Sequence, residues 1–315
     1  MNPKHPPLWA LILKLLRVWR LTFKMPGTLK VSSDKIARMQ KMDDHLSDQA
    51  RKEAEFFDRV YAETDAKHRL ENYVVPDEIV RQVTRPGPRP LLHREYACSL
   101  LGSLKGKRLL DYGAGDGWNT VCFAKAGAKV WAIDISQKSI ELTRKKAAAN
   151  GVAGSVVAEV RDACRTRFPS AMFDVIYGGG ILHHLDVRAA APELCRILRP
   201  DGVAVFYEPI RETRAMDVVK ALALRLLNRR PKEVTGTETP LTRGRIALLR
   251  PWFEVVRYRQ FEVLSSANAL IPSRTLKWFL LWADDLLMRC LPAFAELGRA
   301  VVIELRRPLK GGDEG

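Results

Sequence analysis

The chain has 315 residues, of which 47% are hydrophobic and 28% are charged, and its formal net charge is +16. This composition provides enough apolar side chains for a buried core and excludes a disordered chain. The five cysteines are odd in number and form no Cys-x-x-Cys pair, which argues against a disulfide framework and against a zinc site, and indicates a reducing compartment.

The positive charge is concentrated at the N-terminus, where residues 1–41 contain nine Lys or Arg against one acid. Residues 8–24 follow a helical period, with the four cations on one side and a broad apolar face that includes Trp19 on the other. This pattern is typical of a helix that lies in a membrane interface. It fits equally a helix that packs on the enzyme's own core or on a partner subunit. The recurring charges exclude a spanning helix, and no cleavage site for a signal peptide follows.

The next segments are also predicted to be helical. Pro26-Gly27 ends the first helix, and residues 32–69 read as a second, highly charged helical stretch. Residues 84–90, Thr-Arg-Pro-Gly-Pro-Arg-Pro, form a rigid linker into the core.

The most informative stretch is residues 108–120, where a short apolar strand leads into a turn with glycines at 113, 115 and 117 and then into a helix. Glycines at this spacing permit positive φ and the close approach of a ligand, and the helix turns its free N–H groups toward the turn. A second apolar strand ends in Asp134, where nucleotide-binding α/β folds hold ribose hydroxyls. The pattern predicts an adenosine-containing cofactor. The alternative is that the glycines only make tight turns in a cofactor-free domain.

Two carboxylates near this turn, Asp111 and Asp116, disfavour a pyrophosphate, because like charges at close range are costly. Trp118 also stands where the dinucleotide fingerprint requires glycine, so a nicotinamide-dependent oxidoreductase is disfavoured. The pattern Asp-x-Gly-x-Gly-x-Gly resembles motif I of class I S-adenosylmethionine-dependent methyltransferases. The resemblance continues in order through Arg161-Asp162-Ala163, residues 173–185 and residues 193–208, and covers roughly residues 93–208.

The resemblance implies a role for each matching residue. Asp111 and the glycine turn would hold the methionine portion of S-adenosyl-L-methionine, Asp134 the ribose and Asp162 the adenine, and Gly179 would leave room beside the sulfonium. The implied cofactor-binding residues are Asp111, Gly113, Ala114, Gly115, Gly117, Asp134, Ile135, Asp162, Ala163 and Gly179. The segment over 55–61 resembles the aromatic segment that often precedes such a core and helps to close it. No run resembles the metal site of catechol-methylating enzymes, so no metal is expected.

Methyl transfer to oxygen or nitrogen also requires removal of a proton, which favours a base with a pKa near the working pH. Two of the six histidines, His183 and His184, follow the fourth strand, where the acceptor arrives in this fold. We predict that one of them is the base or orients the acceptor, with His184 ahead of His183. The alternative is that the pair caps the following helix or supports the loop. Glu208 and Asp186 are further candidates, with Glu208 as the third predicted catalytic residue.

The predicted elements alternate. Strands are predicted over residues 107–112, 128–134, 155–160, 173–177 and 202–208, and helices over residues 118–126, 137–149 and 189–198. Such alternation implies a parallel sheet with helices on both faces. Helices near 214–229 and 241–249 follow, and strands over 253–264 and 300–307 complete a Rossmann-like, seven-stranded, mostly parallel α/β sheet. These elements predict three regions, namely residues 1–90 (helical arm and linker), 91–210 (cofactor-binding core) and 211–315 (C-terminal helices and last strands).

An unusually apolar insert over residues 265–298 separates the last two predicted strands and contains Trp278, Phe279 and Trp282. It is either an extra helical pair that completes the core, or a lid or apolar substrate wall that touches a membrane. Asp284 and Asp285 interrupt it, so it does not span a bilayer as a simple helix.

The sequence therefore predicts a methyltransferase that acts on O, N or C of a small, hydrophobic or lipid-linked acceptor. The residues around the histidine pair look most like the family that includes quinone, sterol and natural-product methylating enzymes. The alternatives are a methyltransferase acting on RNA or protein and a noncatalytic membrane-associated scaffold. Nucleic acid is disfavoured as a partner because the Trp- and Leu-rich face of residues 8–24 suits a membrane. The expected location is cytoplasmic, peripheral to the inner face of the membrane.

Overall fold

The structure, a computed structural model, describes residues 50–66, 73–84, 86, 91–211, 241–265, 271, 273–291, 294 and 297–309. The chain divides into two compact units, Met1–Ser47 and Asp48–Gly315, and every described residue belongs to the second. The helices predicted over 8–24 and 214–229 lie outside the described residues, as do most of the predicted linker and part of the apolar insert.

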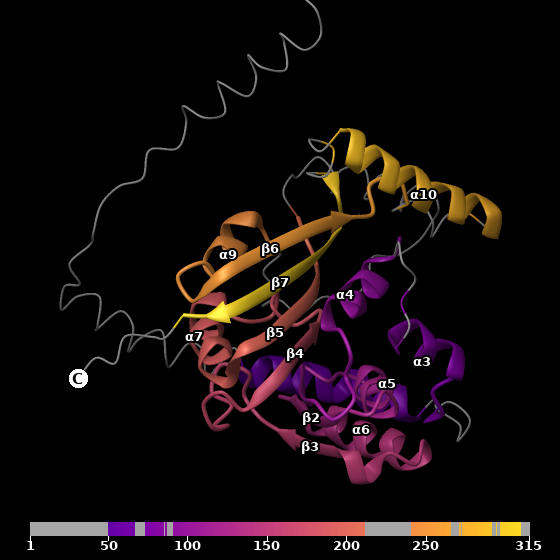
Figure 1. The fold of residues 1–315 in the computed structure, drawn as a ribbon. Coiled ribbons are helices and arrows are strands. Elements are labelled where there is room, and N and C mark those ends of the chain that lie inside the picture. Colours follow the sequence, from indigo (N-terminus) through magenta and orange to yellow (C-terminus); the bar gives the residue numbers. More distant parts are fainter. Residues whose placement is uncertain are drawn as a thin grey trace, which may run out of the picture. The chain divides into compact units, whose positions relative to one another are not determined.

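A seven-stranded sheet with the strand order β3-β2-β1-β4-β5-β7-β6 forms the centre of the second unit (Figure 1). The strands are β1 Arg108–Tyr112, β2 Lys129–Asp134, β3 Val156–Val160, β4 Phe173–Gly179, β5 Leu198–Pro209, β6 Phe253–Phe261 and β7 Ala300–Pro308. The strands from β3 to β5 pair in parallel, whereas β7 runs antiparallel to both β5 and β6. The predicted Rossmann-like, seven-stranded, mostly parallel α/β sheet is confirmed.

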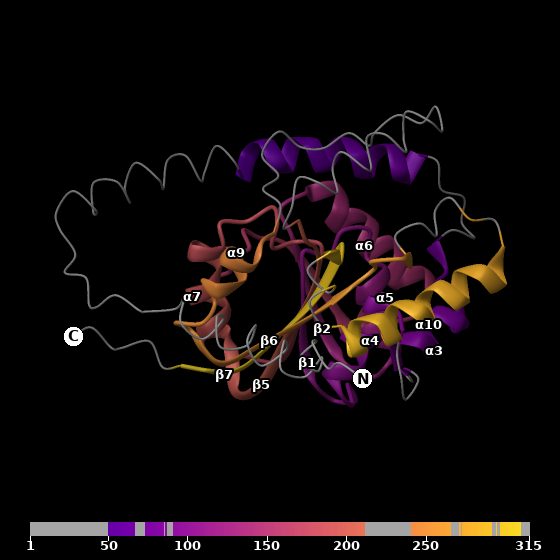
Figure 2. The ribbon, with the colours of Figure 1, turned by 90° about the horizontal axis from the view of Figure 1, so that it is seen from above.

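Helices cover both faces of the sheet (Figure 2). One face carries α7 Val187–Ile197 and α9 Arg243–Ala247, and the other carries α3 Asp77–Thr84, α4 His93–Leu101, α5 Trp118–Lys125 and α6 Gln137–Ala149. Successive residues of a strand point to opposite faces, so Leu110 packs in the core beneath α7 while Leu109 packs in the core beneath α5. Burial on both faces explains why these strands read as continuous apolar runs.

The connection from β3 to β4 contains no helix, although the short 3-10 helix Ala153–Ser155 precedes β3. Phe168 from this connection is buried in the core beneath α7, with its ring centroid 5.0 Å from that of Phe173. A loop side chain therefore covers sheet surface that a crossover helix would otherwise cover.

A helix over residues 50–66 crosses the carboxyl ends of the strands, as seen at the top of Figure 2. Its Asp58 accepts hydrogen bonds from the Ser136 hydroxyl (2.6 Å) and from the backbone N–H of Lys138 (3.0 Å), at the start of α6. Towards its N-terminal end, Glu53 lies beside His184, which follows β4. The helix thus spans from the end of β2 to the end of β4.

The helix α10, Arg274–Cys290, lies between β6 and β7 in the chain, at the periphery of the fold (Figure 1). It supplies the described part of the apolar insert. Its N-cap is Ser273, whose hydroxyl accepts a hydrogen bond from the backbone N–H of Leu276.

Candidate functional site

A glycine turn connects β1 to α5. Gly113, Gly115 and Gly117 all have left-handed backbone conformations, with φ of 81°, 58° and 80°. At Gly117 a Cβ would also lie only 2.7 Å from Cα of Thr143 on α6, so a side chain is excluded there on both grounds. The turn therefore needs glycine for its own conformation and for the packing of α5 against α6.

Asp134 at the end of β2 holds this turn in place. One carboxylate oxygen accepts a hydrogen bond from the backbone N–H of Gly115, and the other accepts one from Ser136, both at 2.9 Å. Burial raises the pKa of Asp134, and the hydrogen bonds from Ser136 and Gly115 oppose that rise. Ile135 lies between these contacts, at the point where the chain leaves β2 for α6.

Asp111, the last but one residue of β1, is fully buried beside the turn. Its Oδ2 accepts a hydrogen bond from the Thr120 hydroxyl (2.5 Å), whereas its Oδ1 has no hydrogen-bond partner within the described part of the chain. Burial raises the pKa of this carboxyl to about 7. An unsatisfied buried carboxylate oxygen is costly unless a donor arrives, and a cationic ligand would provide one.

Asp116 within the turn forms an ion pair with Lys146 of α6, at 2.8 Å from Nζ to the carboxylate. The Lys146 side chain is fully buried, with Nζ 4.9 Å from the centroid of the Trp118 ring. Burial lowers the pKa of Lys146, while the pairing with Asp116 opposes this. The positive charge of Lys146 therefore compensates the negative charge of Asp116. Of the two carboxylates that were expected to repel a pyrophosphate, only Asp111 has no cationic partner in the described part of the chain.

The helix over residues 50–66 reaches the same turn through Tyr61. The Tyr61 hydroxyl oxygen lies 3.1 Å from the position that a Cβ on Gly115 would occupy. Burial, followed by the negative charges of Asp134 and Asp116, raises the pKa of this hydroxyl well above its usual value. The Tyr61 ring stacks on Phe57, at 5.8 Å between centroids. The aromatic segment predicted over 55–61 thus faces the glycine turn.

His183 pairs with Glu208 across the carboxyl ends of β4 and β5. Nδ1 of His183 lies 2.8 Å from Oε2 of Glu208, which is completely buried. The other oxygen of Glu208 accepts hydrogen bonds from the backbone N–H groups of Ile181 (2.9 Å) and Leu182 (2.8 Å). Glu208 therefore fixes both the loop after β4 and the orientation of the imidazole. Because a carboxylate accepts at Nδ1, exchange of a proton with another molecule falls to Nε2.

His184 has a second carboxylate partner. Its Nδ1 lies 3.3 Å from Oε2 of Glu53, on the helix over residues 50–66. The ring of Phe57 meets the His184 ring edge to face, at 5.2 Å between centroids. The two imidazoles are close to each other, with 4.0 Å between their centroids. The structure thus brings together two histidines and two buried glutamates.

Neither histidine caps the following helix. Asp186 is the N-cap of α7, and its side chain accepts a hydrogen bond from the backbone N–H of Arg188 (2.9 Å). Arg245 from α9 secures the same loop by donating to the carbonyls of Leu182 (3.3 Å) and Leu185 (2.5 Å). The loop that carries the histidines is therefore fixed by α7 and α9, which lie on the same face of the sheet.

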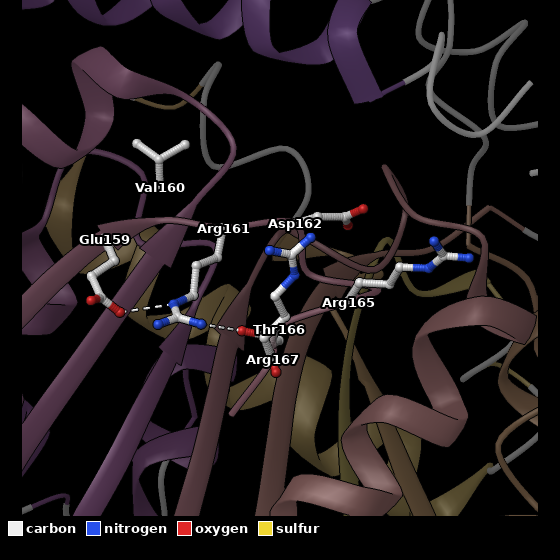
Figure 3. A pocket seen from close by; sticks show the side chains of 7 residues that line it. All are labelled: Glu159, Val160, Arg161, Asp162, Arg165, Thr166 and Arg167. Carbon is white, nitrogen blue, oxygen red and sulfur yellow. Dashed lines mark hydrogen bonds and ion pairs between the residues drawn. The ribbon is translucent and has the colours of Figure 1, made fainter. Parts of the chain in front are cut away.

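Asp162 and Ala163 lie after β3, beside a pocket of about 640 Å³ (Figure 3). The pocket is lined by Glu159, Val160, Arg161, Asp162, Arg165, Thr166 and Arg167. Arg161 bridges the carboxylate of Glu159 (2.8 Å) and the carbonyl of Thr166. Asp162 accepts a hydrogen bond from the backbone N–H of Cys164 (2.7 Å), and the Ala163 carbonyl accepts one from the buried Tyr112 hydroxyl (2.5 Å).

The glycines at the end of β4 differ in their surroundings. A Cβ on Gly178 would lie 2.5 Å from the ring of Phe206. A Cβ on Gly179 would meet protein atoms only at 3.5 Å, an ordinary contact distance. The protein's own packing therefore requires glycine at 178, whereas a methyl group at 179 would fit in ordinary contact with Asn119 and Tyr177.

A family model for a methyltransferase domain matches residues 110–206, which contain the glycine turn, Asp134, Asp162 and both histidines. The core of this chain is a methyltransferase domain. It is of the class I, S-adenosylmethionine-dependent type, as the sequence motifs predict, and S-adenosyl-L-methionine is its cofactor.

Curated relatives match parts of the chain. A 27-O-demethylrifamycin SV methyltransferase from Amycolatopsis mediterranei is 37% identical over 99 residues, which are 31% of this chain and 36% of the relative. A ubiquinone biosynthesis O-methyltransferase from Actinobacillus pleuropneumoniae is 31% identical over 145 residues, which are 45% of this chain and 62% of the relative. The chain thus spans between about a third and two thirds of the length of these relatives.

Among solved structures, the crystal structure of the [4+2]-cyclase SpnF is similar, with 19% sequence identity and a TM-score of 0.49. The similarity covers 68% of this chain and 79% of that chain.

The residues of the methyltransferase domain fit its cofactor. The buried, unpartnered Oδ1 of Asp111, beside the glycine turn, suits the ammonium of the methionine portion. Asp134 keeps acceptor capacity for ribose hydroxyls in addition to its two backbone hydrogen bonds. Among the described residues, no group of three or more His, Cys, Asp or Glu side chains is arranged so that it could hold a metal ion.

Two residues at this site carry no signal in the sequence. Glu53 lies 131 positions from His184 in the chain, and a glutamate in a charged helical stretch reads as part of a solvated face. Lys146 reads likewise as one of several exposed lysines on α6. Only the packing of helices on the sheet brings both side chains to the turn and the histidine pair.

Proposed function

We propose that this chain transfers the methyl group of S-adenosylmethionine to an oxygen atom of a small, hydrophobic acceptor. The main support for this proposal is the His183–Glu208 pair, which lies at the carboxyl end of β4 beside the glycine turn. Ile181 connects the two features, since a Cβ on Gly113 would lie 2.9 Å from the Ile181 side chain. A base and a cofactor turn in one place are what transfer to a hydroxyl requires.

The cofactor supplies an electrophilic methyl group on a sulfonium. His183 acts as the base: Glu208 holds its Nδ1–H, so Nε2 is directed to take the proton of the acceptor hydroxyl. Glu208 is a positioning residue, because its two oxygens are occupied by His183 and by the loop amides. His184, which the sequence placed ahead of His183, orients the acceptor with Glu53 behind it.

The choice of acceptor is supported by the relatives and by the surroundings of the histidines. The two curated relatives are named for O-methylation in rifamycin and ubiquinone biosynthesis. Phe57 and Tyr61 cover the histidines and the glycine turn with aromatic rings, which favours an acceptor with an apolar body. The alternative of an RNA or protein acceptor depends on the basic residues 1–41, which lie outside the described residues.

Calorimetric titration with S-adenosylmethionine, with NAD as the control ligand, tests the cofactor assignment. We expect binding of the first alone, with a dissociation constant in the micromolar range, which corresponds to about −8 kcal/mol. Binding of NAD, or of neither ligand, would contradict the proposal.

Transfer of a labelled methyl group to phenolic and quinol acceptors tests the base. We expect His183→Ala to lower kcat by about 10²–10⁴, the usual contribution of a general base, while the affinity for S-adenosylmethionine stays unchanged. The exposed Asp201→Ala is the matched control. A His183→Ala variant with full activity would exclude His183 as the base.

A further inference from the structure

The two acidic residues of α10 face the body of the protein. Asp284 is 3% exposed, and its carboxylate accepts hydrogen bonds from the backbone N–H groups of Leu264 (2.6 Å) and Ser265 (2.8 Å) and from the Ser265 hydroxyl (2.5 Å). This carboxylate therefore anchors the middle of the helix to the segment that follows β6.

Asp285 forms ion pairs with two arginines. Its carboxylate lies 2.7 Å from the guanidinium of Arg259 on β6 and 2.9 Å from that of Arg289, one turn further along α10. Arg259 in turn lies over the rings of Tyr96 and Phe261, at 4.9 and 4.8 Å. Asp284 is thus bound on the inner side of α10, while Asp285 is paired inward with Arg259 and along the helix with Arg289.

The outer face of α10 is apolar. Fifteen large hydrophobic side chains are exposed in the described part of the chain, and eight of them lie in residues 276–297. Three aromatic side chains of α10 are among the most exposed, with Trp278 at 48%, Phe279 at 57% and Trp282 at 54%. The apolar face consists of Leu276, Trp278, Phe279, Trp282 and Leu286, and Leu291, Phe294 and Leu297 in the segment after α10 are exposed as well. This arrangement reverses the usual one, in which a surface helix turns its apolar side inward.

We propose that α10 docks this protein on the surface of a lipid bilayer, with the apolar face in the interface and the helix axis parallel to the membrane plane. With 17 residues the helix is about 25 Å long, and it lies at the periphery of the fold (Figure 1). No helix within the described ranges has the length and the apolar character to cross a bilayer.

Charge and side-chain type favour a lipid surface over a protein partner. With Asp284 buried and Asp285 paired with arginines, the charged side chain exposed beside the apolar face is cationic, namely Arg289, which is 53% exposed. Cations beside an exposed apolar face suit anionic headgroups. Tryptophan combines an apolar ring with one polar N–H, which is why it concentrates at membrane interfaces. The proposal is independent of the acceptor, since the contacts that hold α10 are made with β6 and the segment after it.

Co-sedimentation with vesicles of phosphatidylcholine and phosphatidylglycerol, using the full chain in 0.5 M salt, tests the proposal. High salt screens the attraction that a net charge of +16 exerts on any anionic surface, so the apolar contribution dominates. We expect Phe279→Ser with Trp282→Ser to lower the partition coefficient at least about tenfold. The matched control, Val74→Ser with Val157→Ser, removes two side chains of similar exposure elsewhere and should bind as the wild type does. Equal binding of both double variants, or no binding of the wild type, would overturn the proposal.

Quenching of tryptophan fluorescence by brominated phosphatidylcholine locates the contact. We expect strong quenching in the wild type and its loss in Trp278→Phe with Trp282→Phe, which keeps the apolar character of α10. Full quenching in that variant would place the membrane contact elsewhere, for example on the predicted helix over residues 8–24, and would overturn the assignment to α10. A dimer in sedimentation velocity that the serine variant converts to a monomer, without any vesicle binding, would show that the face joins two copies of this chain instead.

Discussion

Asp111 is a carboxylate whose folded environment satisfies only one of its oxygens. Burial raises its pKa from the usual 3.8 to about 7. Between pH 4 and 7 the folded chain therefore holds a proton that the unfolded chain releases, and this group's contribution to stability falls as the pH rises through that window. A cationic ligand favours the ionised form, so the affinity for the cofactor should change in the opposite direction.

Calorimetry at pH 6 and pH 8 checks this expectation. The affinity of the wild type for S-adenosylmethionine should rise by up to about tenfold relative to that of Asp111→Asn, because the ionised fraction of a group with a pKa of about 7 rises about tenfold over this range. Comparison with the variant cancels the titration of the ligand. A wild type and a variant with the same pH dependence would show that Asp111 does not face the cofactor.

Asp134 combines a structural and a predicted ligand-binding role. Asp134→Ala should weaken cofactor binding by about 1.5–3 kcal/mol, the scale of a hydrogen bond to a charged group. Part of that loss would come from the freed Gly115 N–H, so Asp134→Asn, which keeps one acceptor oxygen, should lose less. Unchanged calorimetric affinity in the alanine variant would remove Asp134 from the site.

The two glycines at the end of β4 give a matched pair of variants. Gly178→Ala should destabilise the fold by about 1–3 kcal/mol in urea denaturation, because its methyl group would overlap the Phe206 ring. Gly179→Ala should leave stability within about 0.5 kcal/mol of the wild type and weaken cofactor binding instead. If both variants lost stability alike, the space beside Gly179 would serve packing and not a ligand.

At the scale of elements, the helix over residues 50–66 is secured to α6 through the two hydrogen bonds that Asp58 accepts. Asp58→Ala should therefore raise amide exchange in this helix by about tenfold or more, given the typical strength of hydrogen bonds to a carboxylate. Hydrogen exchange with mass-spectrometric readout measures this, and Glu55→Ala, an exposed carboxylate on the same helix, is the control. Equal exchange in the two variants would mean that other contacts secure the helix.

The elements of the core could be predicted from the sequence because their signals are local. The strands that end in Asp111 and Asp134 are apolar runs followed by turn residues, and the glycine spacing specifies the loop between β1 and α5. The start of β5 could not be predicted in the same way. It begins at Leu198, four residues before the predicted start at 202, because Leu198 pairs with Phe173 across an irregularity in the ladder.

Site residues could be predicted from the sequence where they belong to one short motif. They could not be predicted where segments far apart in the chain come together. The glycine turn and the histidine pair each lie within a few residues, whereas Glu53 and Lys146 reach the site only through the packing of helices. The helices α3 and α4 were also not predicted, since they flank the Pro-rich residues that read as a linker. Which carboxylates of α10 face inward likewise depends on its contacts with β6 and the segment after it.

At the scale of the whole molecule, every site residue described above belongs to the unit Asp48–Gly315. Deletion of residues 1–47 should therefore leave the affinity for S-adenosylmethionine within about twofold of the full chain, less than 0.5 kcal/mol. Deletion of residues 1–72 also removes Glu53, Asp58 and Tyr61 and should weaken binding well beyond that. Calorimetry on both variants decides this, and a large loss in the shorter deletion would assign the N-terminal unit to the site.

The predicted membrane helix over residues 8–24 is tested at the same scale. A chain without residues 1–30 should bind vesicles less well than the full chain if that segment lies in the interface. Unchanged co-sedimentation in low salt would contradict the membrane interpretation of the arm and leave packing on the protein or on a partner subunit.

The helix over residues 50–66 lies before the stretch by which the family is recognised, residues 110–206, yet it brings Glu53 and Tyr61 to that stretch's site. The helix over residues 50–66 and the matched residues 110–206 can therefore be substituted independently of each other. Substitutions in this helix alter the walls around the histidines while the recognised signature stays constant. If these walls contact the acceptor as proposed, a substitution in this helix would change acceptor preference without changing any residue that the family model matches.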